Sequence, residues 1–462
     1  MPSTPKHAPN ASRPNANRNA APSEGPDIST APLWLERRFQ LHAHGTTWQR
    51  EVGAGLTTFL AMAYITIVNP AILSETGMDF GAVFVATCLA AAAGTLLMGV
   101  LANYPIGLAP GMGQNAFFTY TVCLGLGYPW QTALGAVFLS GLIFIALSIL
   151  PVREWLINAI PRSLKHGMAT GIGLFLAFIA LKNAGVVQDN PATLVSLGEL
   201  TEPGPMAALL GFALIAALAA RGLRGAILVG MLIVSLGAWL TGLADFNGLL
   251  SVPPSPAPVF GQLDLAAALD PALISVILAL LLVDVFDTAG TLVAIASRGD
   301  LLDTSGRLPR MRGALLADSA ATGLGAVFGT SSTTSFIESA AGVEAGGRTG
   351  LTAATVSALF LLCLVFAPLA QSIPPFASAA ALLFVATLMA RSLADLDWDD
   401  LTDAAPAVVT AIAMPLSFSI ADGIGIGFIC YAAIKVLAGR ATECPPAVYV
   451  IALTFALKFA LL

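Results

Sequence analysis

The feature that most constrains the fold of this chain is a succession of apolar segments that begins near residue 52 and is interrupted only by short breaks. A helix needs about 20 mainly apolar residues to cross the hydrocarbon core of a membrane. Only 10% of the 462 residues are charged, whereas a soluble domain has about 25%. The sequence therefore predicts an all-α membrane protein.

Twelve of these segments are clear candidates for membrane spans: residues 53–73, 80–102, 129–151, 165–187, 205–220, 224–243, 271–296, 313–328, 350–370, 375–391, 404–419 and 422–438. Two further segments, 106–123 and 329–345, are shorter, rich in Gly and small polar residues, and broken in the middle. Counting both gives a prediction of fourteen transmembrane segments.

The ends of the chain differ from this apolar body. Residues 1–45 are rich in Pro, Asn, Ala and Ser without a long apolar run, which predicts a disordered cytoplasmic tail. They also lack the basic, apolar and small-residue regions of a signal peptide. Residues 446–462 are apolar, and we expect a terminal interfacial helix; whether it crosses the membrane is left open by the sequence.

The basic residues indicate the orientation of the chain, because cytoplasmic loops of membrane proteins are enriched in Lys and Arg. With fourteen crossings and a cytoplasmic N-terminus, all 21 basic residues except Lys182 and Lys458 fall on the inner side. The long outer loop 244–270 contains no basic residue. Both termini are therefore predicted to be cytoplasmic, in a multi-pass protein of the bacterial inner membrane.

The two broken segments occupy matching positions, each the third of seven spans. Paired, Gly-interrupted segments at corresponding positions are typical of inverted-repeat transporters. We therefore expect two inverted seven-span repeats, at 50–243 and 271–438. Pro110 and its neighbouring glycines prevent a regular helix in the first broken segment, and residues 329–335 favour extended backbone in the second. Such irregular backbone is tolerated at membrane depth only against protein or a water-filled cavity.

Acidic residues within the spans are the candidate site. Asp284 and Asp287 are three residues apart, which places them on one helix face, and Glu338 follows the extended part of the second broken segment. Gln114 and Asn115 occupy the corresponding place in the first. Charged side chains inside a membrane are expensive and usually functional. Asp318, in a neighbouring span, is expected to tether the inner loop instead.

The chemistry of these residues favours a neutral ligand with N–H donors, because the predicted site has carboxylates and amides but no cation. An anion would require Arg or Lys. Aromatic residues near the site could stack on a flat ring (Phe117, Phe118, Tyr120, Phe286 and Phe336). A buried carboxyl group favours its neutral, protonated form, and two close acids share their protons. We therefore expect transport to be coupled to a proton gradient. The five cysteines have no metal-binding spacing, and we expect no cofactor other than the proton gradient.

Four motifs resemble the hypoxanthine–adenine–guanine permease branch of the nucleobase:cation symporter-2 family, which includes xanthine and uracil permeases. They lie at residues 107–118 (GLAPGMGQNAFF), 160–175, 283–292 (VDVFDTAGTL) and 333–350. The resemblance extends from about residue 50 to 440.

This resemblance implies a core domain of segments 1–4 and 8–11 and a gate domain of segments 5–7 and 12–14. It also implies a short strand and a half-helix in segments 3 and 10, a homodimer formed through the gate, and elevator-type motion of the core. No nucleic acid partner is expected; the expected partners are a purine nucleobase, the proton and membrane lipid.

In the family, the site uses an amide in the third segment, an acid in the eighth and an acid in the tenth. These match Asn115, either Asp284 or Asp287, and Glu338. Asp287 is nearer the position of the acid in the uracil relatives, although the sequence leaves the choice open. We expect Glu338 and Asn115 to hold the base, and one acid of the eighth segment to carry the proton. Gln114, Thr334 and Phe336 complete the predicted substrate-binding set.

The prediction is thus a proton-coupled importer of hypoxanthine, guanine or adenine, and not an enzyme. The residues after Glu338 lack the Asn-x-Gly signature of the xanthine and uracil branches, which argues against xanthine, uracil and ascorbate. A symporter for another nucleobase such as xanthine or uracil, or a nucleobase channel, remains the alternative. An intramembrane aspartyl protease is disfavoured, because Phe428 stands where its Gly-x-Gly-Asp motif requires the acid.

Overall fold

The computed structural model describes residues 32–149, 160–299, 301 and 308–461. Most of the predicted disordered tail and Leu462 of the predicted terminal helix lie outside the described residues. Within the described residues, nine helices are long and apolar enough to cross a membrane. Each of the twelve apolar segments predicted from the sequence contains a helix in the structure.

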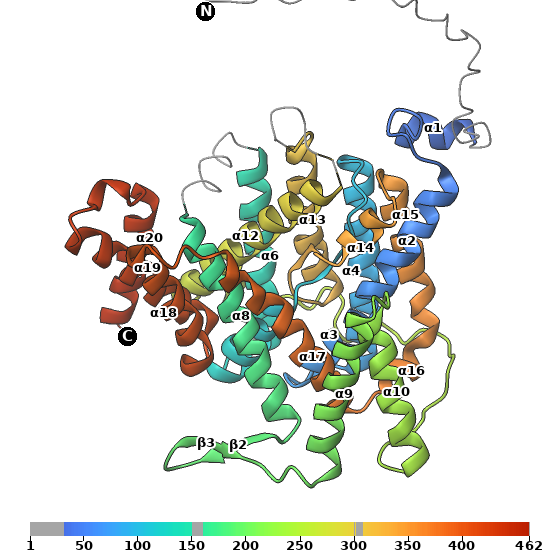
Figure 1. Cartoon of the computed structure of the whole chain (residues 1–462), viewed down its shortest axis with the longest axis horizontal. Helices are drawn as coiled ribbons and strands as arrows, with labels where there is room; N and C mark the ends of the chain where they lie inside the picture. The colour runs from blue at the N-terminus through green and yellow to red at the C-terminus, as the bar shows by residue number, and fades with distance from the viewer. Residues whose placement is uncertain (1–31, 150–159, 300, 302–307, 462) are drawn as a thin grey trace, which may run out of the picture.

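The first half of the chain consists of the following elements: α1 (Leu33–Phe39), α2 (Trp48–Met62), α3 (Ile65–Ser74), α4 (Phe80–Leu101), β1 (Leu108–Pro110), α5 (Met112–Ala116), the π-helix η1 (Phe117–Gly125), α6 (Trp130–Ile149), α8 (Arg162–Asn183), β2 (Val187–Asn190), β3 (Leu194–Leu197), α9 (Pro203–Ala220) and α10 (Ala226–Thr241). Strands β2 and β3 form a hairpin that extends from the rest of the molecule (Figure 1).

The second half consists of α11 (Leu265–Ala268), η2 (Pro271–Leu273), α12 (Ile274–Arg298), α13 (Met311–Phe328), β4 (Thr333–Ser335), α14 (Ser339–Glu344), α15 (Gly350–Cys363), η3 (Leu364–Phe366), α16 (Ala367–Gln371), α17 (Pro375–Ala390), η4 (Arg391–Asp395), α18 (Leu401–Ser417), α19 (Ile420–Leu437), η5 (Ala441–Glu443) and α20 (Pro446–Leu461). A helix thus covers most of the predicted terminal segment, and it packs against α19.

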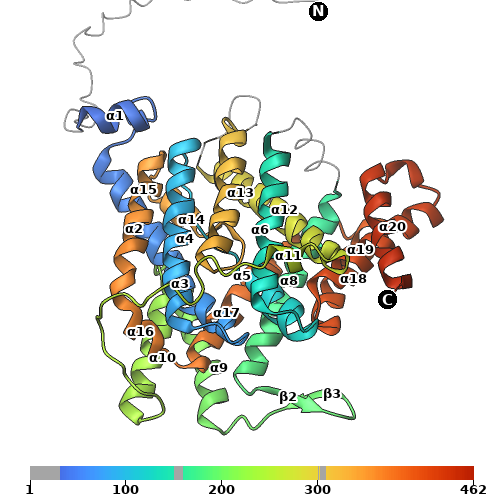
Figure 2. The same ribbon diagram turned by 180° about the vertical axis from the view of Figure 1, so that it is seen from behind.

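The helices pack mainly within two groups. In the first group, α13 packs between α4 and α6, and α15 packs against α2 and α4. Figure 2 shows α4, α13 and α6 side by side. In the second group, α8 packs against α17 and α18, while α9 packs against α10 and α17. Helix α12 lies where the two groups meet, against α6 and α19.

Strands β1 and β4, which are more than 200 residues apart in the sequence, pair in the antiparallel sense. Ala109 lies opposite Thr334, and the backbone N–H groups of Gly111 and Phe336 extend the pairing at its two ends. Each strand leads into a short helix, α5 or α14. The pairing therefore satisfies backbone groups that would otherwise be unpaired in the interior of the molecule.

Tight glycine contacts hold the first group of helices together. A Cβ atom at Gly94 of α4 would lie 2.7 Å from Cβ of Ala321 of α13, and one at Gly99 would lie 2.7 Å from the carbonyl oxygen of Gly350. These helices approach closely only because small residues line their interfaces. The close packing fixes α4, α13 and α15 around the paired strands.

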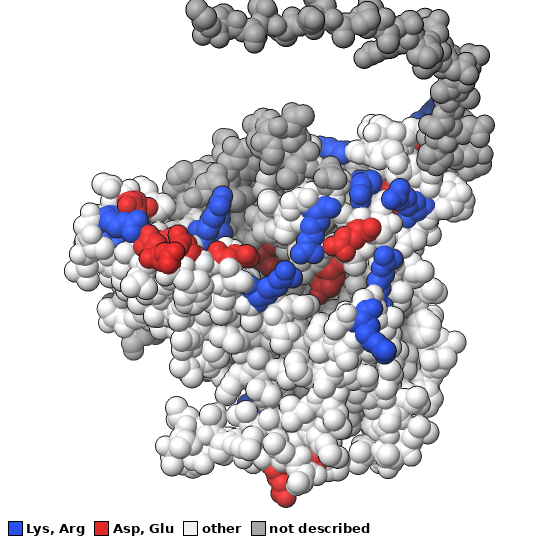
Figure 3. Space-filling view, in the orientation of Figure 1, with Lys and Arg blue, Asp and Glu red and all other residues white. Residues whose placement is uncertain are grey.

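Charged residues are unevenly distributed over the molecule. Figure 3 shows basic side chains spread across the upper half of this face, from the part that carries α1 to the part that carries α18–α20, whereas the end with the β2–β3 hairpin shows mainly a few acidic side chains. In α1, Leu35 and Phe39 pack against Leu351 at the start of α15, and Arg37 and Arg38 occupy its last turn. The basic end of the molecule is the one predicted to be cytoplasmic.

Candidate functional site

Asp284 is sealed inside the protein, in the middle of α12. Its side chain is 1% exposed. One carboxylate oxygen accepts a hydrogen bond from Nε2 of Gln114 at 3.2 Å, and the other accepts one from the Thr322 hydroxyl at 2.8 Å. Two predicted site residues, Asp284 and Gln114, are therefore in direct contact, and Gln114 serves to hold the carboxylate.

A second sealed carboxylate, Asp318 of α13, lies beside Asp284. Asp318 is fully buried and accepts a hydrogen bond from the Ser335 hydroxyl at 2.9 Å, while its other oxygen has no partner among the described residues. The two acids are close enough to interact electrostatically. The expectation that Asp318 tethers the inner loop was wrong, because its side chain points instead to strand β4 in the protein interior.

The two helices present matching pairs of side chains to each other. Asp284 and Thr288 are one turn apart on α12, as are Asp318 and Thr322 on α13. Thr322 binds Asp284, and the hydroxyl of Thr288 interacts both with Asp318 and with the Thr334 hydroxyl at 2.8 Å. Thr334, a predicted site residue, is thus part of a hydroxyl network around the sealed acids.

Asp287, one turn further along α12, is in a different environment. Its side chain is exposed, as are Gly290 and Val293 on the same face of the helix. This exposed stripe leads to Arg298 at the end of α12, which pairs with Glu344 at 3.6 Å. Asp287 is therefore reached from the basic end of the molecule.

Glu338 stands at the start of α14 and is half-buried. Its Oε1 accepts a hydrogen bond from the Tyr64 hydroxyl at 2.7 Å. Glu338 is also close enough to Asp287 to interact with it electrostatically. The structure thus brings together two predicted acids from different segments, and both retain contact with solvent.

Asn115, the predicted substrate-binding amide, lies between the two broken segments. It is completely buried, and its Oδ1 accepts a hydrogen bond from Ser331, just before β4. Its Nδ2 has no partner among the described residues. Asn115 therefore connects the two broken segments, and it leaves one amide donor available inside the protein.

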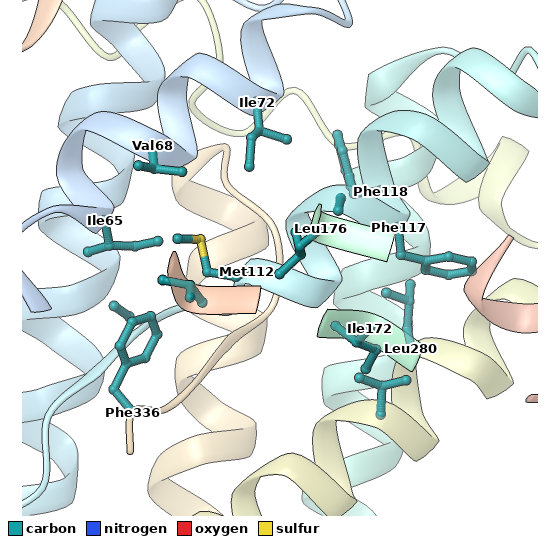
Figure 4. Packing of buried hydrophobic residues seen from close by; sticks show 14 of the residues in the cluster. Ile65, Val68, Ile72, Met112, Phe117, Phe118, Ile172, Leu176, Leu280 and Phe336 are labelled. Carbon is teal, nitrogen blue, oxygen red and sulfur yellow. The ribbon is translucent and has the colours of Figure 1, made fainter. Parts of the chain in front are cut away.

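Apolar side chains pack around α5, next to the broken segments. Figure 4 shows Met112 of α5 between Phe336 on one side and Ile172 and Leu176 of α8 on the other. Phe336, Met112 and Ile172 are nearly buried but keep a small exposed edge. Of the aromatic residues predicted to stack on a ring, Phe336 and Phe286 keep such an edge, whereas Phe117, Phe118 and Tyr120 are packed away from solvent.

No cation neutralises these acids within the described part of the chain. None of the ion pairs there includes Asp284, Asp287, Asp318 or Glu338. The described part of the chain also contains no group of three or more His, Cys, Asp or Glu side chains that could hold a metal ion. The Lys165 ammonium lies 5.3 Å from the centre of the Phe286 ring, beside Asp287. The four carboxylates can accept N–H donors or protons.

The end of the site remote from α1 is closed by contacts between η1, which packs on α6 of the first group, and α8 of the second group. The Tyr120 hydroxyl of η1 donates to Glu75 at 2.6 Å, and Asn183 at the end of α8 donates to both residues. Phe418, between α18 and α19, packs its ring against Tyr120. Phe418 has a φ of 53°, which is a strained backbone conformation for a bulky residue.

Sequence reasoning missed the contact of Asp318 with Ser335 and that of Tyr64 with Glu338. An acid in the middle of an apolar span was the available signal for Asp318, since such residues are costly without a purpose. Tyr64 carries no comparable signal, because a tyrosine in an apolar helix is usually a packing residue. Only the approach of α3 to α14 shows that its hydroxyl reaches Glu338.

Comparison with known proteins places this chain among permeases. Residues 49–426 match the family model Xan_ur_permease, described as "Permease family". The chain is 48% identical to the adenine permease AdeP of Escherichia coli (strain K12) over 424 residues, which cover 92% of this chain and 95% of AdeP. It is 43% identical to the guanine/hypoxanthine permease PbuO of Bacillus subtilis (strain 168) over 437 residues, which cover 92% of this chain and all of PbuO.

The fold is also similar to a solved structure, the transmembrane domain of a cyanobacterium bicarbonate transporter, BicA. The TM-score is 0.61 at 15% sequence identity, and the match covers 81% of this chain and 96% of that one. At this identity, the similarity concerns the fold alone.

Proposed function

Since this chain belongs to the permease family, whose model matches residues 49–426, we propose that it imports purine nucleobases together with protons. Membership of the family and the named relatives identify a membrane transporter and not an enzyme, and they confirm the resemblance to purine nucleobase permeases. The proposed substrates are hypoxanthine, guanine and adenine, because the relatives are named as adenine and guanine/hypoxanthine permeases.

The observation that carries this proposal is the pair of accessible acids, Asp287 and Glu338. They lie close together where α12 packs against α14, without an ion-pair partner among the described residues. Phe286 and Phe336, which neighbour them in the sequence, each keep a small exposed edge. A carboxylate accepts N–H donors strongly, and an aromatic or apolar edge suits a flat ring. A purine base presents both features.

Of the two acids of α12, we assign Asp287 to the substrate side and Asp284 to the proton. Asp287 is reached by solvent, whereas Asp284 is sealed against Asp318. Two adjacent carboxylates without a cation cannot both be charged in a dry interior except at great cost. The Asp284–Asp318 pair therefore retains a proton, and its release requires a change in its surroundings during the transport cycle.

Asn115 and its neighbours take a supporting part in this proposal. Asn115 links α5 to the segment before β4. We assign its buried Nδ2, which has no partner among the described residues, to a ring nitrogen or carbonyl of the base. Gln114 connects the substrate side to the sealed pair through Asp284. A change at the base is thereby transmitted to the proton site over a short hydrogen-bonded path.

We further propose the fourteen-segment architecture of two inverted seven-span repeats, with the first helix group as core and the second as gate. The antiparallel pairing of β1 with β4 supports it, because these strands come from the third and tenth predicted segments. The separate packing of the two helix groups also supports it. The basic residues near α1 favour cytoplasmic termini in a bacterial inner membrane. The predicted homodimer through the gate remains part of the proposal.

The contacts at the two ends of the site favour an inward-facing state. The exposed stripe of α12 opens toward the basic end, while Glu75, Tyr120 and Asn183 close the other end. Elevator-type motion of the core relative to the gate would open the Tyr120–Asn183 contact, because these two residues belong to different helix groups. Import would then alternate between the two arrangements.

The test is uptake of labelled hypoxanthine, guanine and adenine by cells that lack their own purine uptake systems, with and without a protonophore. The proposal predicts accumulation of at least one of these bases and its loss when the proton gradient collapses. Uptake that is insensitive to the protonophore would contradict symport and favour a channel. Full uptake by the Glu338→Gln variant would contradict the assigned site.

A further inference from the structure

Tyr64 lies at an irregular turn inside the first membrane span. Helix α2 ends at Met62 and α3 begins at Ile65, within the apolar span Trp48–Ser74. The N–H groups of Thr66 and Ile67 bond to carbonyl groups three residues back, so the chain winds more tightly there than an α-helix. Short tight turns within a helix often mark functional positions.

The Tyr64 hydroxyl makes a contact that packing alone does not require. The side chain is fully buried, yet its hydroxyl donates to Oε1 of Glu338 at 2.7 Å. No other side chain of the described residues donates a hydrogen bond to Glu338. A hydroxyl that donates to a carboxylate forms a short, charge-assisted bond, which is stronger than one between neutral groups.

The backbone around this hydrogen bond is held on both sides. Helix α14, which follows Glu338 directly, packs so closely on α2 that a Cβ atom at Gly342 would overlap the Thr58 hydroxyl and lie 2.7 Å from the Ala54 carbonyl oxygen. The Ser339 hydroxyl accepts a hydrogen bond from the N–H of Gly107 at 2.9 Å. The distance between Tyr64 and Glu338 is therefore set by rigid neighbours.

We propose that Tyr64 is a positioning residue for substrate recognition. It occupies Oε1 of Glu338 and fixes the rotation of the carboxylate, so that Oε2 is directed to one N–H donor of the bound base. This inference rests on the proposed function, in which Glu338 binds a purine. It adds that the first span, through a residue that does not touch the substrate, sets the orientation of the acceptor.

The chain offers a matched control for this role. Tyr104 is also buried, and its hydroxyl has no hydrogen-bond partner among the described residues. Replacing either tyrosine with Phe removes one buried hydroxyl and leaves the ring in place. The two variants therefore differ in whether Glu338 loses its donor.

The experiment measures equilibrium binding of hypoxanthine, guanine and adenine to the purified full-length protein, together with Km and Vmax of uptake in cells. For Tyr64→Phe, we expect Kd and Km to rise about tenfold, the usual effect of losing one charge-assisted hydrogen bond, while Vmax changes less than about twofold. Tyr104→Phe is expected to bind as the unmodified protein does. Unchanged Kd and Km in Tyr64→Phe, or a fall in Vmax alone, would overturn the inference.

A double variant separates this inference from the proposed function. If Tyr64 acts through Glu338, the Tyr64→Phe/Glu338→Gln variant has the same Kd as Glu338→Gln alone, since coupled residues are not additive. If the fold-changes in Kd of the two single variants multiply in the double variant, the two residues act independently, and the inference is overturned. Failure of the proposed function has a different signature, namely no purine binding by the unmodified protein or full binding by Glu338→Gln.

Discussion

Two acids of one helix, Asp284 and Asp287, are a single turn apart and have opposite environments. Asp284 faces α13, where Asp318 and Thr322 enclose it, whereas Asp287 lies on the exposed stripe near Glu338. The molecule therefore contains a sealed pair, Asp284–Asp318, and an open pair, Asp287–Glu338. Neither pair has a cation among the described residues to neutralise it.

The difference between the pairs teaches that a shared helix face does not imply a shared role. The sealed pair is surrounded by hydroxyl donors and has no contact with water, so it suits a proton. The open pair is accessible and flanked by apolar edges, so it suits a substrate with N–H groups. Removing one acid from each pair is the most direct way to examine this division.

The largest effect is expected from Glu338→Gln. The variant loses a charged acceptor for the base, which costs about 1.5–3 kcal/mol, or roughly 10- to 150-fold in Kd. Asp318→Asn, in the sealed pair, is expected to change Kd less than about threefold. Purine Kd values of the two purified variants provide the comparison, and equal losses of affinity would contradict the division into two pairs.

The next largest effect concerns how the open pair is held in place. Gly342→Ala is expected to force α14 away from α2, because the added Cβ has no room beside Thr58, and overpacking of this kind costs about 1–3 kcal/mol. A thermal unfolding scan of the purified protein measures the loss. Gly53→Ala is the matched control on α2, since nothing lies within 4 Å of its added Cβ. A stable Gly342→Ala variant that binds purine normally would refute the packing argument.

A smaller effect is expected at the closed end of the site. Tyr120→Phe removes the hydroxyl that joins Glu75 and Asn183 across the two helix groups. Loss of these hydrogen bonds costs about 1 kcal/mol, which shifts the equilibrium between the inward-facing and outward-facing states about fivefold toward the outward-facing state. Leu124 is 53% exposed near the outer end of η1, and a Leu124→Cys variant can be labelled with a maleimide to monitor opening. Because the chain has five cysteines of its own, labelling is compared with the parent that keeps Leu124. An unchanged labelling rate in Tyr120→Phe would count against this contact as a closure.

The smallest effect is expected at Asp400, a carboxylate that forms an ion pair with Arg440. A hydrogen bond from Thr402 and the Arg440 guanidinium together lower the pKa of Asp400, at the start of α18, to about 2. A lowered pKa gives stability that is present above about pH 4 and is lost as the pH falls toward 2. Because the pair is partly exposed and screened by salt, Asp400→Asn is expected to lower Tm by a few degrees at most at pH 7, and this difference should shrink below pH 4. A large loss of Tm at neutral pH would show that solvent screens this cluster less than its exposure indicates.

The sequence predicted the positions of the helices well, because apolar length and Gly or Pro breaks are local properties. It also located the broken segments around Pro110 and residues 329–335, where backbone choice is again local. The pairing of β1 with β4 involves residues more than 200 positions apart, and no local pattern specifies such a partner. The family resemblance implied a short strand in each of the two segments but not their pairing.

The same limit explains what was missed in the site. Asp284 and Asp287 have the same residue type and nearly the same sequence surroundings, so only the packing of α13 separates a sealed acid from an accessible one. Asp318 was given a different role because it lies about one turn into its span, near the predicted inner loop. The hydrogen bond between Asn115 and Ser331 was also missed, because it depends on the approach of two distant segments.

The central claim is that the sealed pair carries the proton and the open pair holds the base. Its most direct test is simultaneous measurement of purine uptake and internal acidification in proteoliposomes that contain Asp318→Asn, with the unmodified protein alongside. The account predicts that the variant binds purine and exchanges it across the membrane but neither acidifies the lumen nor accumulates purine against its gradient. Purine-dependent acidification equal to that of the unmodified protein would contradict it.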